Sequence, residues 1–377
     1  MMTWQYAEND VYLFAVRFMD MVSKMEFNVL LSLWSLILAI PIVSTPPSTY
    51  IEQDIYIYNC DDGIRLAGTL TIPDSIKPHA AIVLATGSGP QNRDEEWNGH
   101  RPFKYLASHL AEHGYAVLRM DDRGIGESQG DSDESSVNDY IRDLNAAIEK
   151  LDSCFGKSMC KGIFGHSEGG TAAIRNAVDN PRCGFIITWG APAWDGDSIV
   201  MSQTRARMQA EHGGWENESA KKQKYMLELI KSDMPEGTLL RKLIMIVVPE
   251  AKDTIGFSDV PARTFEQLRY MISPPFREII RNRPESYIKS VTVPWLALNG
   301  DKDSQVMPEN LRLISKWNPQ ATTVMLKDHN HWMQHCLTGE IKEYDTIAED
   351  ISQEMLDIIT DWLDRQFHVR ISSGQDQ

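Results

Sequence analysis

A serine flanked by two glycines ends a short apolar run, and its surroundings suit nucleophilic chemistry. The run from Ile163 to His166 leads into Ser167, and Gly165 and Gly169 lie two residues to either side. Glycine permits the strained, closely packed backbone of a sharp strand-to-helix turn, which exposes the hydroxyl at its apex. The Ala-rich helix expected at 171–178 would direct free N–H groups toward an oxyanion there. The pattern predicts a nucleophile elbow of an esterase-like hydrolase.

A second Gly-x-Ser-x-Gly pattern surrounds Ser128, but its context differs. The acidic, hydroxyl-rich segment 131–136 that follows is typical of a loop and offers no apolar helix. Ser167 is therefore the stronger candidate nucleophile. The alternative for Ser167 is a tight turn without chemistry.

Two late loops carry the groups that would activate a serine. A serine hydroxyl needs a base to take its proton, and that histidine needs a carboxylate to orient it. Asp301 and Asp303 lie in the loop 298–306, and His329 and His331 lie in the loop 327–334. The order Ser, Asp, His is the one expected on a doubly wound sheet.

The same residue types allow a different reading, as a metal site formed by His329, His331, His335, Asp301 and Asp303. Metal-assisted hydrolysis would leave the turn at Ser167 unexplained. The segment Gly87-Ser88-Gly89 opens like a dinucleotide fingerprint, but Asn92 occupies the position of its third glycine. We therefore predict neither a cofactor nor a metal.

Strands that alternate with helices indicate how these loops come together. Continuous apolar runs predict strands buried on both faces, and the intervening segments have helical periodicity. The sequence predicts an α/β fold with a doubly wound, mostly parallel sheet that opens with an antiparallel hairpin, 50–58 and 64–72. Ligands of such sheets bind at the carboxyl ends of the strands. The further strands are expected at 80–85, 116–120, in the run from residue 163 that leads into Ser167, and at 185–189, 293–298 and 322–326. The helices are expected at 102–113, 137–151, 309–316 and 351–367.

The alternation stops between residues 194 and 290, where the pattern is helical and charged. We interpret this segment as a helical cap inserted over the strand ends. It would divide the hydrolase core into a first part, 49–193, and a second part, 291–377. Helices are expected within it at 198–212, 218–232, 239–248 and 262–271.

Composition and the N-terminus limit the partners and the location. The formal charge of −16 over 377 residues disfavours nucleic acid, because phosphates would be repelled. Residues 27–43 form an uncharged apolar run that suits a signal-peptide core. We expect residues 1–48 to be a signal peptide or an N-terminal anchor of an exported protein, periplasmic or extracellular, with this segment as its sole membrane contact. A buried core helix is the remaining alternative.

Five cysteines show no metal-type spacing. In an exported protein Cys154 and Cys160 bracket a short loop and could form a disulfide; free cysteines are an equal alternative.

Six motifs together resemble the carboxylesterase-type α/β-hydrolases that carry a Gly-Ser-Gly-Pro-Gln…Arg-Asp loop after the third strand. This resemblance implies Ser167 as nucleophile, Asp303 as orienting acid and His331 as general base. The chain departs from many of these enzymes at Thr86, where they have histidine. The motifs are TGSGPQNRD (86–94), DDRGIGES (121–128), GHSEGG (165–170), GAPAWDGD (190–197), NGDKDSQV (299–306) and NHWMQ (330–334).

The resemblance also implies an oxyanion hole and a substrate class. The backbone N–H groups of Glu168 and Ser88 would hold the oxyanion, with Gly89 as the alternative to Ser88. The expected substrate is a small acyl ester of short or medium chain length. A peptidase, a thioesterase or acyltransferase with the same triad, and a non-catalytic binding protein are the alternatives. The aromatic residues expected at the pocket are Trp97, Trp194 and Trp332.

Overall fold

An eight-stranded sheet in the order β1-β2-β4-β3-β5-β6-β7-β8 organises the fold. The structure, a computed structural model, describes residues 49–132, 135–248 and 260–367. β1 pairs antiparallel with β2, β2 pairs antiparallel with β4, and the pairs from β4 through β8 are all parallel. The predicted opening hairpin and mostly parallel sheet are confirmed. The strands are β1 (Tyr50–Asn59), β2 (Ile64–Pro73), β3 (Ala81–Ala85), β4 (Ala116–Met120), β5 (Lys161–His166), β6 (Phe185–Trp189), β7 (Trp295–Gly300) and β8 (Thr322–Leu326).

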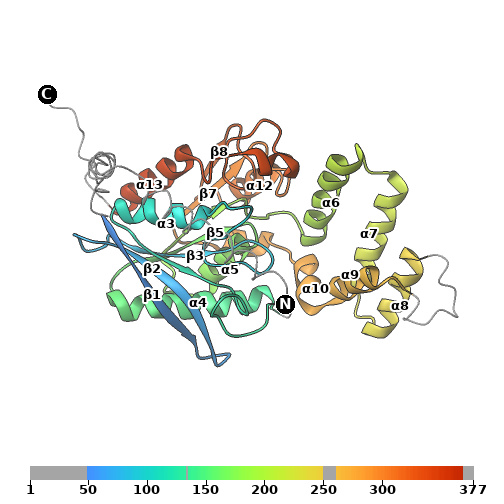
Figure 1. Cartoon of the computed structure of the whole chain (residues 1–377), viewed down its shortest axis with the longest axis horizontal. Coiled ribbons are helices and arrows are strands. Elements are labelled where there is room, and N and C mark those ends of the chain that lie inside the picture. Colours follow the sequence, from blue (N-terminus) through green and yellow to red (C-terminus); the bar gives the residue numbers. More distant parts are fainter. Residues whose placement is uncertain (1–48, 133–134, 249–259, 368–377) are drawn as a thin grey trace, which may run out of the picture. The chain divides into compact units, whose positions relative to one another are not determined.

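Helices cover both faces of the sheet, which explains why its central strands, β3 to β6, are buried along their whole length. Along β3, Ala81 and Val83 pack in one hydrophobic cluster with α4 (Val137–Phe155) and α5 (Glu168–Asp179). The alternate residues Ile82 and Leu84 pack in a second cluster with α3 (Pro102–Glu112) and α13 (Gln353–Phe367). Figure 1 shows α3 and α13 on the side of the sheet opposite α4. The strands that carry the site loops at their carboxyl ends are therefore packed against helices on both faces of the sheet.

Among the described residues, five helices between residues 196 and 281 share a hydrophobic core of their own, and we call this group the cap. Figure 1 shows these helices grouped together. That core includes Leu227, Leu239, Leu243 and Ile280, each of which is buried. The five helices are α6 (Gly196–His212), α7 (Asn217–Lys231), α8 (Glu236–Val247), α9 (Ala262–Ile272) and α10 (Pro274–Arg281).

Two short helices near the end of the cap were not expected from the sequence. α10 begins at Pro274-Pro275, which the sequence suggested only as a break between helices. Proline is tolerated in the first turn because the N–H groups there have no partner within the helix. α11 (Glu285–Ser290) follows, and its Ile288 packs into the main hydrophobic cluster under the sheet rather than into the cap core.

The remaining elements lie after β7. They are α12 (Glu309–Trp317) and a 3-10 helix, η2 (Ile341–Thr346).

Residues 1–48 and 49–377 divide into two units, and the predicted signal segment lies outside the described residues. Among the helices of the described ranges, none is long and apolar enough to cross a membrane.

All five cysteines are free, so the suggested Cys154–Cys160 disulfide is absent.

Candidate active site

Ser167 lies at the sharp turn between β5 and α5. Its backbone has φ 52° and ψ −117°, a left-handed conformation that non-glycine residues adopt rarely. A Cβ atom on Gly165 would overlap the backbone of Gly169, and one on Gly169 would overlap the backbone of Ala85. The Ser167 N–H donates to the carbonyl of Trp189 at 2.9 Å. The glycines thus allow the close approach of strand and helix that the turn requires, and neighbouring strands hold it.

His331 and Asp303 are brought together by the loops after β8 and β7. The Nδ1 atom of His331 lies 2.7 Å from Oδ2 of Asp303. The other carboxylate oxygen accepts the backbone N–H groups of Gln305 at 2.9 Å and Val306 at 2.8 Å. Asp303 is only 1 % exposed. A carboxylate held in this way fixes the imidazole with its proton on Nδ1 and leaves Nε2 as the basic nitrogen.

Ser167 and His331 line the same cavity, which has a volume of about 370 Å³. Gly87 and Ser88, in the loop after β3, line it as well. The cap contributes Val200, Gln203, Thr204, Arg207 and Phe276. A hydroxyl, an imidazole and a glycine-containing loop therefore meet at the carboxyl edge of the sheet, under the cap.

Acidic side chains anchor the loop after β3. One carboxylate oxygen of Asp122 accepts the Thr86 hydroxyl at 2.8 Å, and the other accepts the Gln91 N–H at 2.9 Å. Asp121 binds the guanidinium of Arg93 at 2.7 Å. Burial raises the pKa of Asp122 well above its usual value, although the hydrogen bonds from Thr86 and Gln91 oppose this rise. Thr86 thus helps to attach the loop after β3 to the loop after β4.

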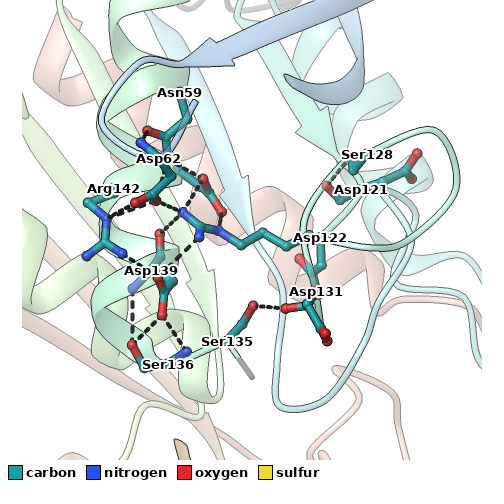
Figure 2. A network of polar contacts seen from close by, with 12 residues as sticks. Asn59, Asp62, Asp121, Asp122, Ser128, Asp131, Ser135, Ser136, Asp139 and Arg142 are labelled. Carbon is teal, nitrogen blue, oxygen red and sulfur yellow. Dashed lines mark hydrogen bonds and ion pairs between the residues drawn. The ribbon is translucent and has the colours of Figure 1, made fainter. Parts of the chain in front are cut away.

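A network of carboxylates surrounds Arg123, just beyond this loop. Its Nε donates to Asp143 at 2.5 Å, and its other nitrogens reach Asp139 and Asp62. Arg142 shares Asp62 and Asp139, and Figure 2 shows these three residues grouped beside Asn59. The network joins α4, the β1–β2 turn and the loop after β4.

Ser128, the second serine between glycines, has a structural role. Its hydroxyl donates to the carbonyl of Asp121 at 2.8 Å and accepts the N–H of Ala67 at 2.9 Å. Figure 2 places Ser128 next to Asp121, on the far side of this network from Arg142. Its buried hydroxyl is fully used in fixing the loop.

The sequence is similar to known hydrolases. A family model described as serine aminopeptidase, S33, matches residues 99–223, less than half of the chain. Esterase EstD of Thermotoga maritima is 26 % identical over 326 residues, which are 84 % of this chain and 68 % of that protein. 2,6-Dihydropseudooxynicotine hydrolase of Paenarthrobacter nicotinovorans is 25 % identical over 132 residues, 34 % of this chain and 33 % of that protein.

Several solved structures with the same architecture superpose with TM-scores just above one half. The esterase Pf2001 of Pyrococcus furiosus superposes with a TM-score of 0.51 at 16 % identity, covering 84 % of this chain and 91 % of that one. The α/β hydrolase GrgF of a Penicillium species superposes with a TM-score of 0.52 at 15 % identity, covering 84 % and 99 %. This chain has the α/β-hydrolase fold.

Within the α/β-hydrolase core, the rival acid and base candidates have other partners. Asp301 is exposed and accepts the N–H of Asp328 at 2.6 Å. His329 is buried, with Nδ1 2.7 Å from the carbonyl of Lys327 and Nε2 2.7 Å from the hydroxyl of Ser352. His335 is exposed and pairs with Glu349.

The five residues considered as an alternative metal site are hydrogen-bonded or ion-paired with the separate partners described above. His329, His335 and Glu354 still have ligand atoms within 4.8 Å of one another. Both ring nitrogens of His329, however, are already hydrogen-bonded to Lys327 and Ser352. His329 is therefore explained as a satisfied core histidine.

Some of the aromatic residues line the cavity, and others pack behind the residues that line it. Trp332 lines the cavity, and Trp97 stacks on it with ring centroids 5.5 Å apart and planes 16° apart. Trp194 lines an adjoining cavity of about 170 Å³ that also includes Ser167 and Glu168. Trp189 is fully buried and donates its indole N–H to the carbonyl of His331 at 2.8 Å.

Two residues that the sequence did not single out, Glu95 and His166, also line the cavity. Glu95 and His166 are both buried, with Nδ1 of His166 2.8 Å from a carboxylate oxygen of Glu95. His166 was seen only as part of the motif around Ser167, and Glu95 as the residue after the Arg93-Asp94 segment. The available signal was the adjacency of His166 to the candidate nucleophile.

Proposed function

We propose that the protein is a serine hydrolase that cleaves carboxylic esters of short to medium acyl chain length. The observation that carries this proposal is the shared cavity: Ser167 at its turn and His331, paired with Asp303 at 2.7 Å, line the same space. A hydroxyl at a strained turn, a base and an orienting carboxylate are the parts that acyl transfer to serine requires.

The reaction would proceed through an acyl-enzyme. His331 takes the proton of Ser167 as Oγ bonds to the ester carbonyl carbon, and Asp303 stabilises the resulting imidazolium. The proton then passes to the departing alcohol oxygen as the ester C–O bond breaks. Water, deprotonated by the same imidazole, attacks the acyl-serine and releases the acid.

The backbone N–H groups of Ser88 and Glu168 would hold the tetrahedral oxyanion, each contributing roughly 3 kcal/mol to the transition state. Ser88 and Ser167 both line the cavity, and Glu168 is the first residue of α5, where N–H groups lack partners within the helix. Burial raises the pKa of the Glu168 carboxyl, an effect that a hydrogen bond with Ser88 partly offsets.

The relatives support an ester as substrate. Both Esterase EstD and Pf2001 are named as esterases, and the former aligns over most of this chain. The cavity adjoins a larger one of about 680 Å³ between α6, α7 and η2, with a lining that is mainly cap residues. The cap therefore supplies the walls that would select the acyl and alcohol groups.

Replacing Ser167 by alanine tests the proposal. The wild-type protein should release acid from an aryl ester and be labelled at Ser167 by a fluorophosphonate probe, and Ser167→Ala should do neither. An alanine variant that hydrolyses the ester at the wild-type rate would refute the mechanism. A wild-type protein that neither reacts with the probe nor cleaves esters would support a non-catalytic binding protein.

Amide hydrolysis is the second candidate, favoured by the match of residues 99–223 to the serine aminopeptidase model. The same triad could also serve a thioesterase or acyltransferase. Matched ester, thioester and amide substrates with one acyl group distinguish these activities, since the preferred leaving group gives the largest kcat/KM.

A further inference from the structure

A buried acid–histidine pair joins three segments of the active site. One oxygen of Glu95, Oε1, lies 2.8 Å from Nδ1 of His166 and accepts the N–H of Gly87 at 2.6 Å. The other ring nitrogen of His166, Nε2, lies 3.1 Å from the carbonyl oxygen of His331. The pair thus contacts Gly87, the residue before Ser88, and the backbone of the proposed base, and its own His166 directly precedes Ser167.

The hydrogen-bond partners decide where the protons lie. A carbonyl oxygen can only accept, so Nε2 of His166 must carry a proton to bond His331. An ionised carboxylate also only accepts, and Glu95 Oε1 already accepts from Gly87, so Nδ1 must carry a proton as well. Imidazole is more basic than a carboxyl group by about two pH units, which places the shared proton on the ring.

Burial and the neighbouring charges agree with an ion pair. Glu95 is 0 % exposed and His166 is 2 % exposed. Burial lowers the pKa of His166, but the charge and hydrogen bond of Glu95, the carbonyl of His331 and the charge of Asp303 outweigh it and leave that pKa raised. The ring centroids of His331 and His166 lie 4.7 Å apart. The Asp303 carboxylate, bonded to His331, offsets the repulsion between the two rings when both carry a positive charge.

The backbone conformation of Glu95 is also unusual. Its φ is 51°, a conformation that is unfavourable for a non-glycine residue. A buried ion pair is itself expensive, and here the second carboxylate oxygen of Glu95, Oε2, is buried without a hydrogen-bond partner among the described residues; removing one member of the pair would in addition leave an uncompensated charge. The fold accepts both costs at a point where three active-site segments meet.

We propose that Glu95 and His166 form a permanent carboxylate–imidazolium pair that positions the oxyanion loop and the catalytic histidine relative to Ser167. Both are positioning residues: Glu95 sets the loop of Ser88 through Gly87, and His166 sets the backbone of His331. Because the loop of Ser88 would act mainly in the transition state, the pair should influence kcat more than KM.

Protonation can be tested on the full chain without any assumption about activity. With ¹⁵N-labelled histidine, and with His166→Gln to assign the signals, both ring nitrogens of His166 should carry a proton at about pH 8. An ordinary histidine, with a pKa near 6.5, is neutral there. A His166 ring with one unprotonated nitrogen at this pH would overturn the ion pair.

The positioning role rests on the proposed function and is tested by kinetics. Glu95→Gln should lower kcat for the preferred ester roughly 10- to 100-fold with KM within about twofold, as small displacements of reacting groups do. Glu149→Gln, at the exposed ion pair with Arg182, is the matched control and should retain wild-type kcat. The double variant Glu95→Gln/His166→Gln should be no worse than the more impaired single variant, because the two residues act as a unit.

The outcomes separate the two proposals. If the wild type cleaves esters and labels at Ser167 but a folded Glu95→Gln variant matches it in kcat, the positioning role is wrong and the esterase proposal stands. If the wild type shows neither, the esterase proposal fails, while the protonation of His166 is still decided by its NMR signals. If Glu95→Gln does not fold, His166→Gln provides the same kinetic comparison.

Discussion

The imidazole of His331 contacts Asp303 at 2.7 Å, whereas Asp301, two residues earlier in the same loop, contacts the backbone of Asp328 instead. Only one of the two carboxylates can therefore orient the base. The distinction depends on two backbone N–H groups, those of Gln305 and Val306, which turn the Asp303 carboxylate toward the ring.

Replacing Asp303 by asparagine should reduce kcat on the order of 10⁴-fold. The amide oxygen can still accept from the backbone N–H groups, but its NH2 then faces Nδ1 and favours the wrong imidazole tautomer. Steady-state kinetics with an aryl ester provide the measurement. Asp301→Asn is the matched control, and an equal loss of kcat in that variant would contradict the assignment.

Replacing Ser128 by alanine should lower stability and spare the active-site nucleophile. The Ser128 hydroxyl satisfies the N–H of Ala67 and the carbonyl of Asp121, so its loss leaves buried polar groups unpaired at a cost of about 1–3 kcal/mol. Urea denaturation measures the stability change, and fluorophosphonate labelling of Ser167 should persist. Loss of labelling in a folded Ser128→Ala protein would count against this structural role.

Arg123 and Arg142 share carboxylate partners but differ in burial. The side chain of Arg123 is 8 % exposed and that of Arg142 is 34 % exposed. We expect Arg123→Ala to lower the free energy of unfolding by about 3–5 kcal/mol, because buried Asp143 loses its counter-charge. Arg142→Ala should cost less than about 1 kcal/mol. Chemical denaturation of both variants checks this, and equal losses would show that burial is not the deciding factor.

His109 should make the protein sensitive to mild acid. Burial, together with the charge of nearby His113, lowers its pKa to about 4. In the unfolded chain the pKa is near 6.5, so between these values the unfolded state binds more protons. This contribution to stability is complete above about pH 6.5 and decreases as pH falls toward 4. His109→Gln should reduce the fall in urea midpoint between about pH 7 and about pH 5; an unchanged pH dependence would exclude His109 as its source.

The stacked pair of Trp97 and Trp332 should limit the size of the ester group that the cavity accepts. Trp332 forms part of the wall, and Trp97 supports it from behind. Trp332→Ala should therefore shift the preference in kcat/KM toward bulkier esters, and Trp97→Ala should do so more weakly. A series of acyl chain lengths run on each variant measures the shift, and an unchanged order of preference would exclude this wall as a determinant.

The sequence predicted the sheet well because its signals are local. Buried parallel strands are mainly apolar runs, so 116–120 and 185–189 were placed without error. The edge strand 322–326, of which only Leu326 is buried, was also placed without error. The turn at Ser167 was predicted from Gly165 and Gly169 because the close approach of strand and helix excludes side chains at both. The helices at 274–281 and 285–290 were missed because they are short and prolines stand at their starts, Pro274 and Pro275 in the first and Pro284 just before the second.

The sequence predicted the candidate site less well where the site depends on contacts between residues far apart in the chain. The choice between Asp301 and Asp303 depends on which carboxylate reaches a loop about thirty residues away, which spacing alone leaves open. Glu95 and His166 are 71 positions apart, and no local pattern marks them as partners. Residue types at a motif can thus indicate chemistry, whereas the residues that hold a motif in place emerge only from the packed structure.

The cap helices α6 to α10 pack around a hydrophobic core separate from the two clusters that flank the sheet. Substitutions inside that core can therefore reshape the walls facing the ester while leaving untouched the packing that holds Ser167, Asp303 and His331. Selection can in this way change substrate range through one part of the chain without eroding the reaction carried out by the other.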